Sequence, residues 1–210
     1  MRVRKKKWAP AELVGNPLII RNIKDCNMNL AQCFTEPGLP LHLEIGCGKG
    51  RFICETSLRH PHVNHLAIER DSTIVAAAAR RSLENGACNV RFIICDVDAL
   101  HALLLPGHVS RLYINFCDPW PTKKKRARRR LTHDRYLLMY ESLKIPEIFF
   151  KTDNRILFEF SIECFSRCGW QMSNVSLDLH NSDFEENVVT EYEEKFSAHG
   201  PIYRLEARKI

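Results

Sequence analysis

The sequence predicts a single α/β domain in which a mostly parallel sheet is covered by helices on both faces. Three observations support this prediction. The chain has 210 residues, a usual length for one domain, and 45% of them are hydrophobic, which argues against disorder. From residue 41 onward, short apolar runs alternate with segments of helical periodicity. Acidic residues follow several of these runs, as expected where parallel strands end at one ligand-binding edge.

The expected strands are short and rich in aliphatic and aromatic residues. They cover residues 41–46, 65–69, 90–95, 111–116, 147–152, 171–177 and 203–208. The expected helices lie between them, at residues 50–59, 72–85, 98–105, 132–143, 155–168 and 192–199. This alternation predicts a Rossmann-like, seven-stranded sheet. The first 40 residues have no clear period, so we expect a basic extension over 1–40 that precedes or packs on a core domain of 41–210.

Positive charge is concentrated in two segments. The net charge is +6, from 31 Lys and Arg against 25 Asp and Glu. Five cations lie in the first seven residues, and this segment could contact a polyanion or form a disordered tail. A second run repels itself unless a polyanion neutralises it, so we expect it to contact RNA phosphates. Its members are Lys123, Lys124, Lys125, Arg126, Arg128, Arg129 and Arg130.

The composition argues against a membrane protein and against a secreted one. No apolar run approaches the roughly 18 residues of a membrane span. The basic N-terminus leads into Trp8–Glu12 rather than into the apolar stretch of a signal peptide. We therefore expect a cytoplasmic protein.

The nine cysteines indicate neither a disulfide framework nor a zinc site. Their number is odd, and no CxxC pair occurs. We interpret the cysteines as reduced core residues, as in the apolar segments that hold Cys54, Cys95, Cys117 and Cys164. Three histidines flank a turn at Pro61, where we expect a surface loop and no metal; they are His60, His62 and His65.

A glycine turn follows the first expected strand. Gly46, Gly48 and Gly50 give the spacing GxGxG, not the GxGxxG of a dinucleotide-binding fold. Glu44 lies just before the turn, where it would repel a pyrophosphate but could accept a hydrogen bond from an ammonium group. Such a turn can also be purely structural, so by itself it does not identify a ligand.

The next strands end in acidic residues as well. Glu69 suits the paired hydroxyls of a ribose, and Asp96 could accept from an adenine amino group with Val97 near the ring. Each acid alone could be a helix cap, but three acids at successive strand ends share one crevice. A ligand with an ammonium group, a ribose and an adenine but no phosphate is S-adenosylmethionine (SAM).

The block Asn115–Pro121, which reads NFxDPWP, comes directly before the second basic run. At this point the sequence resembles the bacterial tRNA (guanine-N7)-methyltransferases, which are class I SAM-dependent enzymes. The resemblance covers nearly the whole chain. Besides this specific block it includes residues 2–9, the glycine turn at 43–50, and residues 151–155, 176–182 and 190–196.

The family assigns roles to matching positions of this chain. The resemblance implies a SAM site at Glu44, Gly46, Gly48, Glu69, Asp96, Val97 and Asp118. Asp118 also matches the residue treated as catalytic. The implied substrate site comprises Lys123, Asp153, Thr190, Glu191, Tyr192 and Glu193. The implied product is N7-methylguanosine at position 46 in the variable loop of tRNA. We expect no metal, and the sequence leaves open whether the protein is a monomer or a homodimer.

The chemistry agrees with these residue types. Guanine N7 has an in-plane lone pair, so the reaction needs alignment more than a strong base. Asp118 or Asp153 could accept from the Watson–Crick edge of guanine and stabilise the positive charge that the ring gains. Trp120 could stack on the displaced base or serve only in packing.

Several alternatives stay open at this stage. Thr122 separates Pro121 from the first lysine, so the assignment of Lys123 is uncertain by one position. Thr190 and Glu193 have the spacing of a capping box. Other functions for this scaffold are methylation of a small molecule or protein, and non-catalytic RNA binding with SAM as a structural ligand. A nicotinamide dehydrogenase is disfavoured by the spacing of the glycine turn.

Overall fold

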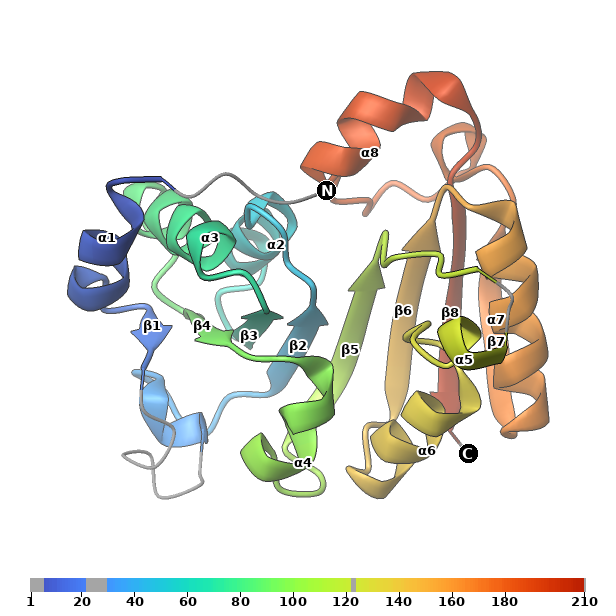
Figure 1. The fold of residues 1–210 in the computed structure, drawn as a ribbon, viewed down its shortest axis with the longest axis horizontal. Coiled ribbons are helices and arrows are strands. Elements are labelled where there is room, and N and C mark those ends of the chain that lie inside the picture. The colour runs from blue at the N-terminus through green and yellow to red at the C-terminus, as the bar shows by residue number, and fades with distance from the viewer. Residues whose placement is uncertain (1–5, 22–29, 122–123, 210) are drawn as a thin grey trace.

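The computed structural model describes residues 6–21, 30–121 and 124–209, with only the backbone described at 124 and 125. Within these ranges the strands form one eight-stranded sheet in the order β1-β4-β3-β2-β5-β6-β8-β7 (Figure 1). The strands are β1 (Ile19–Ile20), β2 (Leu41–Ile45), β3 (Asn64–Glu69), β4 (Val90–Ile94), β5 (Val109–Asn115), β6 (Glu147–Thr152), β7 (Trp170–Ser176) and β8 (Tyr203–Lys209).

Strands β1 to β6 pair in parallel, and β8 runs antiparallel to both β6 and β7. The predicted mostly parallel α/β fold is therefore confirmed, but the predicted count of seven strands is wrong by one. The additional strand is β1, in which Ile19 pairs with Phe92 of β4 and Ile20 with Ile93. Two residues are too few to show alternation in a sequence, so pairing with β4 defines this strand.

Helices cover both faces of the sheet. They are α1 (Ala9–Gly15), α2 (Arg51–Arg59), α3 (Ser72–Glu84), α4 (Leu100–Leu103), α5 (Lys124–Ala127), α6 (Asp134–Ser142), α7 (Arg155–Arg167) and α8 (Glu191–Phe196). One core joins the sheet to Leu100 of α4, Tyr140 of α6 and Phe158 of α7. A second core joins it to Ile53 of α2 and Ala78 of α3. Two separate cores on one sheet are the consequence of a doubly covered fold.

Local sequence accounts for where the helices begin. The side chain of Asp71 accepts hydrogen bonds from the backbone N–H groups of Thr73 and Ile74, and so caps α3. Asn154 caps α7 in the same way through the N–H of Leu157. These caps place each helix directly after a strand, so that the loops at the carboxyl ends of the strands stay short.

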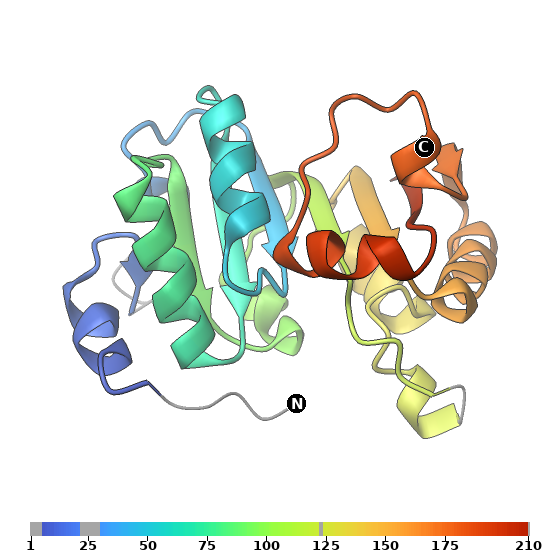
Figure 2. The same ribbon diagram turned by 90° about the horizontal axis from the view of Figure 1, so that it is seen from above.

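The described part of the first 40 residues packs on the rest of the chain. Helix α1 lies against α3, where Glu12 pairs with Arg80 at 2.7 Å and the Arg80 guanidinium lies 4.0 Å from the centre of the Trp8 ring. Helices α1 and α7 lie at opposite ends of the molecule (Figures 1 and 2), and in Figure 1 α8 lies above the arrowheads of β5 and β6. No helix in the described ranges is long and apolar enough to cross a membrane.

Candidate functional site

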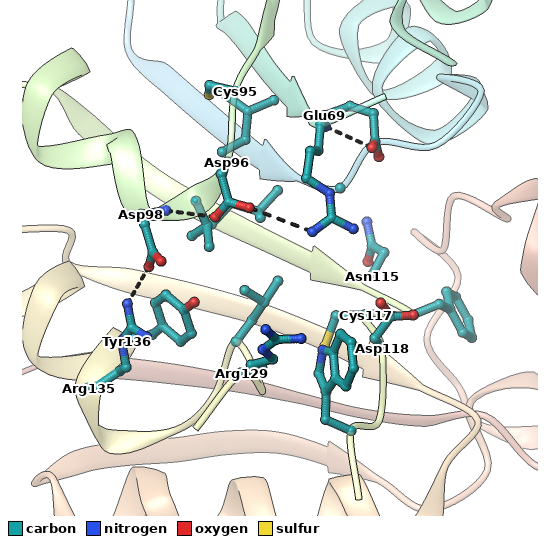
Figure 3. A pocket seen from close by; sticks show the side chains of 18 residues that line it. Glu69, Cys95, Asp96, Asp98, Asn115, Cys117, Asp118, Arg129, Arg135 and Tyr136 are labelled. Carbon is teal, nitrogen blue, oxygen red and sulfur yellow. Dashed lines mark hydrogen bonds and ion pairs between the residues drawn. The ribbon is translucent and has the colours of Figure 1, made fainter. Parts of the chain in front are cut away.

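A cavity of about 500 Å³ opens at the carboxyl ends of β2, β3, β4 and β5. Five of the predicted cofactor residues line it, namely Gly46, Glu69, Asp96, Val97 and Asp118. Figure 3 shows Glu69 and Asp96 on one side of the cavity, with Asp118 and Arg129 on the other. The parallel strands thus bring together acids that lie far apart in the sequence.

Glu44 lies behind the cavity rather than on its surface. It is buried in β2, where the side-chain amide of Asn115 donates a hydrogen bond of 3.0 Å to its Oε1. The other oxygen, Oε2, is buried and has no hydrogen-bond partner among the described residues. Burial raises the pKa of Glu44 to about 8, against the opposing effects of the Asn115 hydrogen bond and the Lys151 charge. This oxygen is therefore available to a cationic ligand, whose charge would favour the ionised, accepting form of the carboxyl.

The glycine turn brings β2 and α2 close to the cavity. Gly46 has φ +76° and lines the cavity with its backbone, and its N–H donates to the carbonyl of Ile68 at 2.8 Å. Gly50 has φ +79°, and a Cβ at that position would lie 2.6 Å from the Cβ of Ala78 in α3. Only glycine adopts this positive φ without strain and has no Cβ to collide with Ala78, so it allows α2 and α3 to approach closely here.

Backbone groups and Arg70 hold the acids of β3 and β4 in place. Oε1 of Glu69 accepts from the N–H groups of Arg70 and Asp71 at 2.8 and 3.0 Å. Asp96 accepts from the N–H of Asp98 at 3.1 Å (Figure 3). Its second oxygen lies 3.7 Å from the Arg70 guanidinium. Sequence reasoning did not identify Arg70, because an arginine after a strand has no distinctive pattern.

The chain turns sharply between β5 and Asp118. Phe116 has φ +51°, a conformation that is uncommon outside glycine and is often found at functional sites. Its N–H donates to the carbonyl of Lys151 at 2.9 Å. After this turn Asp118 is exposed and lines the cavity, and Cys117 lies beside it.

The wall of the cavity beside Asp96 contains side chains that the sequence did not reveal (Figure 3). Asp98 and Arg135 form an ion pair at this wall, next to Tyr136 (Figure 3). The sequence analysis assigned no role to the side chain of Asn115, although the position of this residue in the NFxDPWP block could have indicated one. Arg135 and Tyr136 belong to α6, and only the folded chain brings that helix to the strand ends.

The predicted substrate residues that the structure describes lie beside the cavity rather than in it. The hydroxyl of Tyr192 donates to Oδ2 of Asp153 at 3.1 Å. The Tyr192 ring lies 5.2 Å from that of Phe116, which lines the cavity, and stacks at 4.3 Å on Phe196. The pair Asp153 and Tyr192 is thus joined to the cavity through an aromatic contact.

Glu193 and Thr190 form the capping box that begins α8. Glu193 is fully buried and accepts from Lys151 at 2.7 Å and from the Asn187 amide at 2.7 Å. Glu191 pairs with Arg81 of α3 at 3.1 Å. The structure therefore does not bring Thr190, Glu191 or Glu193 to the cavity surface, and it uses their side chains to hold α8.

The second basic run divides into different environments. Lys123 lies outside the described residues, and the side chains of Lys124 and Lys125 are not described. Arg126 and Arg128 are exposed, and Arg129 lines the cavity with its guanidinium 4.9 Å from the centre of the Trp120 ring. Arg130 is only 1% exposed. The turn after α5 points this side chain inward, so it presents no surface to a phosphate in this structure, and its contact with RNA stays an untested prediction.

Two smaller expectations also need correction. Among the described residues seven cysteines are free thiols, including Cys54, Cys95, Cys117 and Cys164, but Cys33 is disulfide-bonded. His60 and His62 are exposed as expected, whereas His65 is fully buried in β3. Within the described ranges, no group of three or more His, Cys, Asp or Glu could hold a metal ion.

Comparison with known proteins adds an independent finding. A family model described as a putative methyltransferase matches residues 39–205. The chain is 45% identical to the tRNA (guanine-N(7)-)-methyltransferase of Listeria monocytogenes, over 99% of this chain and 98% of that protein. The enzyme of the same name from Bacillus subtilis is 44% identical and covers 98% of each chain.

Solved structures show the same fold at low sequence identity. A 16S rRNA (adenine(1408)-N(1))-methyltransferase from Catenulisporales acidiphilia matches with a TM-score of 0.61 and 15% identity, over 93% of this chain and 97% of that one. A structure described as an antibiotic-related methyltransferase also gives a TM-score of 0.61, with 17% identity over 92% of this chain and 96% of that one. At these identities the likeness concerns the fold alone.

Proposed function

Because the chain belongs to the tRNA (guanine-N(7)-)-methyltransferase family, we propose that it transfers a methyl group from SAM to N7 of a guanine in tRNA. The guanine is position 46 of the variable loop, as the resemblance of the motifs implies, and the reaction takes place in the cytoplasm, where tRNA is found. The observation that carries the proposal is the cavity that places Glu69, Asp96 and Asp118 around one opening beside exposed arginines.

The residues around the cavity fit SAM. The unpaired, buried Oε2 of Glu44 suits an ammonium donor, because a buried acceptor without a partner is costly. Backbone N–H groups fix the carboxylate of Glu69 in an orientation to accept ribose hydroxyls. Asp96 and Val97 line the part of the cavity assigned to adenine. When bound, SAM supplies an electrophilic methyl group on a sulfonium, and its positive charge suits an acid-lined site.

The guanine base is held from the side of the cavity that faces Glu69 and Asp96 (Figure 3). Asp118 is exposed at the cavity, where it can accept from the Watson–Crick edge of guanine and leave N7 free. Asp153 can serve the same edge, with its carboxylate oriented by Tyr192. Since N7 already has a lone pair, these residues accelerate the reaction through alignment and through stabilisation of the charge on the ring.

The exposed arginines suit the phosphates of the tRNA. Arg126 and Arg128 come a few residues after the Asn115–Pro121 block, and Arg129 of the same run lines the cavity, so phosphates bound by this run would lie near the cavity. Binding should weaken with salt, with a log–log slope of roughly −0.7 to −0.9 for each phosphate contacted. We divide the chain into a basic extension, residues 1–40, and a catalytic domain, residues 41–210.

A nucleoside assay tests the proposal. The purified protein is incubated with methyl-labelled SAM and an unmodified tRNA transcript that an authentic family member accepts as substrate. The tRNA is then digested and its nucleosides are separated. We expect label in 7-methylguanosine, and its absence while the positive control is labelled would contradict the proposal. Tight tRNA binding without transfer would instead favour a non-catalytic RNA-binding protein.

A further inference from the structure

Arg130 belongs by sequence to the basic run but by environment to the core. Its guanidinium is buried and lies 4.4 Å from the centre of the Phe160 ring in α7. Burial lowers the pKa of this arginine, although the group stays charged because its ordinary pKa is so high. A buried charge is retained only where specific hydrogen bonds stabilise it. The position of this arginine therefore calls for a reason other than phosphate binding.

The guanidinium of Arg130 donates its hydrogen bonds to the loop of residues 118–120, which contains Asp118. Its Nε donates to the carbonyl of Trp120 at 2.8 Å, and its Nη2 approaches the carbonyl of Pro119 at 3.4 Å. These two carbonyls directly follow Asp118. The third nitrogen, Nη1, is buried and has no hydrogen-bond partner among the described residues. One planar guanidinium thus reaches two successive carbonyls, which a lysine ammonium cannot do with the same geometry.

The segment that carries Arg130 is itself fixed to the domain. The hydroxyls of Thr132 and Ser161 hydrogen-bond at 2.7 Å, which ties this segment to α7. The carbonyl of Arg130 accepts from the N–H of His133 at the start of α6. Arg130 consequently bridges a firmly held part of the fold and the exposed loop that presents Asp118.

We propose that Arg130 is a positioning residue that holds the Asp118–Trp120 loop against α7 and so fixes Asp118 at the cavity. At the other end of the loop, the turn at Phe116 is held by its hydrogen bond to Lys151. The loop is then fixed at both ends, while Asp118 between them remains exposed. The kinetic consequence rests on the proposed function, but the effect on the loop does not.

The test compares Arg130→Lys with Arg128→Ala, a change at an exposed position of the same run. Arg130→Lys should lower kcat by about 10- to 100-fold, the range expected from a small misplacement of a reacting group. Its KM for tRNA and the salt dependence of tRNA binding should stay near the wild-type values. Arg128→Ala should do the opposite, with a higher KM for tRNA, a shallower salt slope and a largely retained kcat.

Hydrogen exchange provides a readout that does not depend on activity. In Arg130→Lys, the peptide spanning residues 116–121 should exchange faster, while peptides of β2 and β5 should keep their wild-type rates. This result would stand even if wild-type protein failed to methylate tRNA, so failure of the proposed function can be recognised separately. If the lysine variant does not fold, Arg130→Met is measured in its place.

Three outcomes would overturn the proposal. The first is a higher KM for tRNA with a retained kcat in Arg130→Lys, which would make this residue an RNA contact. The second is unchanged exchange over residues 116–121. The third is loss of the cooperative unfolding transition in both the lysine and the methionine variants, which would make Arg130 a core residue of the whole domain.

Discussion

Asn115 holds one carboxylate oxygen of Glu44 through a 3.0 Å hydrogen bond and leaves the other, Oε2, buried without a partner among the described residues. Because Asn115 also lines the cavity, this pair connects the interior of β2 with the proposed cofactor site. The unpaired oxygen is what a cationic ligand would complete.

Glu44→Gln should weaken SAM binding. The variant keeps the shape of the side chain but removes its charge, and one acceptor becomes a donor. Loss of a hydrogen bond to a charged group costs about 1.5–3 kcal/mol, so the Kd of SAM should rise about 10- to 100-fold. Calorimetric titration measures it, with Glu163→Gln as the control because Glu163 is exposed on α7. Equal affinities in the two variants would remove Glu44 from the cofactor site.

SAM binding should be linked to release of a proton from Glu44. Burial raises the pKa of this carboxyl to about 8, so at pH 7 it is mostly protonated in the free protein, whereas a bound cation favours the ionised form. Affinity should therefore rise between pH 6 and 7.5, by up to about tenfold per pH unit. Titrations at pH 7 in two buffers of different ionisation enthalpy measure the released proton. Wild type that releases none, or releases no more than Glu44→Gln, would count against the linkage.

Tyr192→Phe should impair the use of tRNA more than the binding of SAM. The change removes the hydrogen bond of 3.1 Å to Asp153 but keeps the ring contacts with Phe116 and Phe196. A single hydrogen bond to a carboxylate suggests a loss of about tenfold in kcat/KM for tRNA. Steady-state kinetics and SAM titration separate the two effects. If kcat/KM is retained, Tyr192 does not orient Asp153 for the reaction.

His65 should make the protein less stable in acid. Both of its ring nitrogens are buried and have no hydrogen-bond partner among the described residues. Burial, and to a smaller extent the charge of His60, lowers its pKa from 6.5 to about 4. Between those values the unfolded chain binds a proton that the folded protein excludes. Stability present above pH 6.5 is therefore lost as pH falls toward 4.

The contribution of His65 to the loss of stability in acid can be measured with His65→Leu, a variant that has no titratable group at this position. Between pH 7 and pH 5, wild type should lose on the order of 2 kcal/mol more of its free energy of unfolding than the variant loses. Urea unfolding at the two pH values gives both losses. The nearby His42 remains in both proteins, and burial lowers its pKa in the same direction. Equal losses would show that His65 titrates normally in the folded state.

The fold could be predicted to a large extent because the central strands β2 and β3 are buried on both faces. All five residues of β2, Leu41–Ile45, are buried, and such runs are visible in a sequence. Strand β1 could not be predicted, since its two residues form a strand only through pairing with β4. Tertiary pairing of this kind leaves no periodic signal.

The site was predictable where function coincides with the ends of strands. Glu69, Asp96 and Asp118 each follow a strand, and parallel topology alone brings them to one cavity. The burial of Arg130 was not predicted, because a charge pattern does not record which way a turn directs each side chain. Arg70 approaches Asp96 only in the folded chain, so no local pattern identifies it.

The most direct test of the central claim locates the methyl group in the tRNA. A tRNA transcript with guanine at position 46 is treated with SAM and protein, then reduced and cleaved with aniline, which breaks the chain at N7-methylguanosine. The account predicts one new cleavage at position 46 with wild type, and none with Asp118→Asn or with a transcript that has adenine at that position. No cleavage with wild type, or equal cleavage with Asp118→Asn, would contradict it.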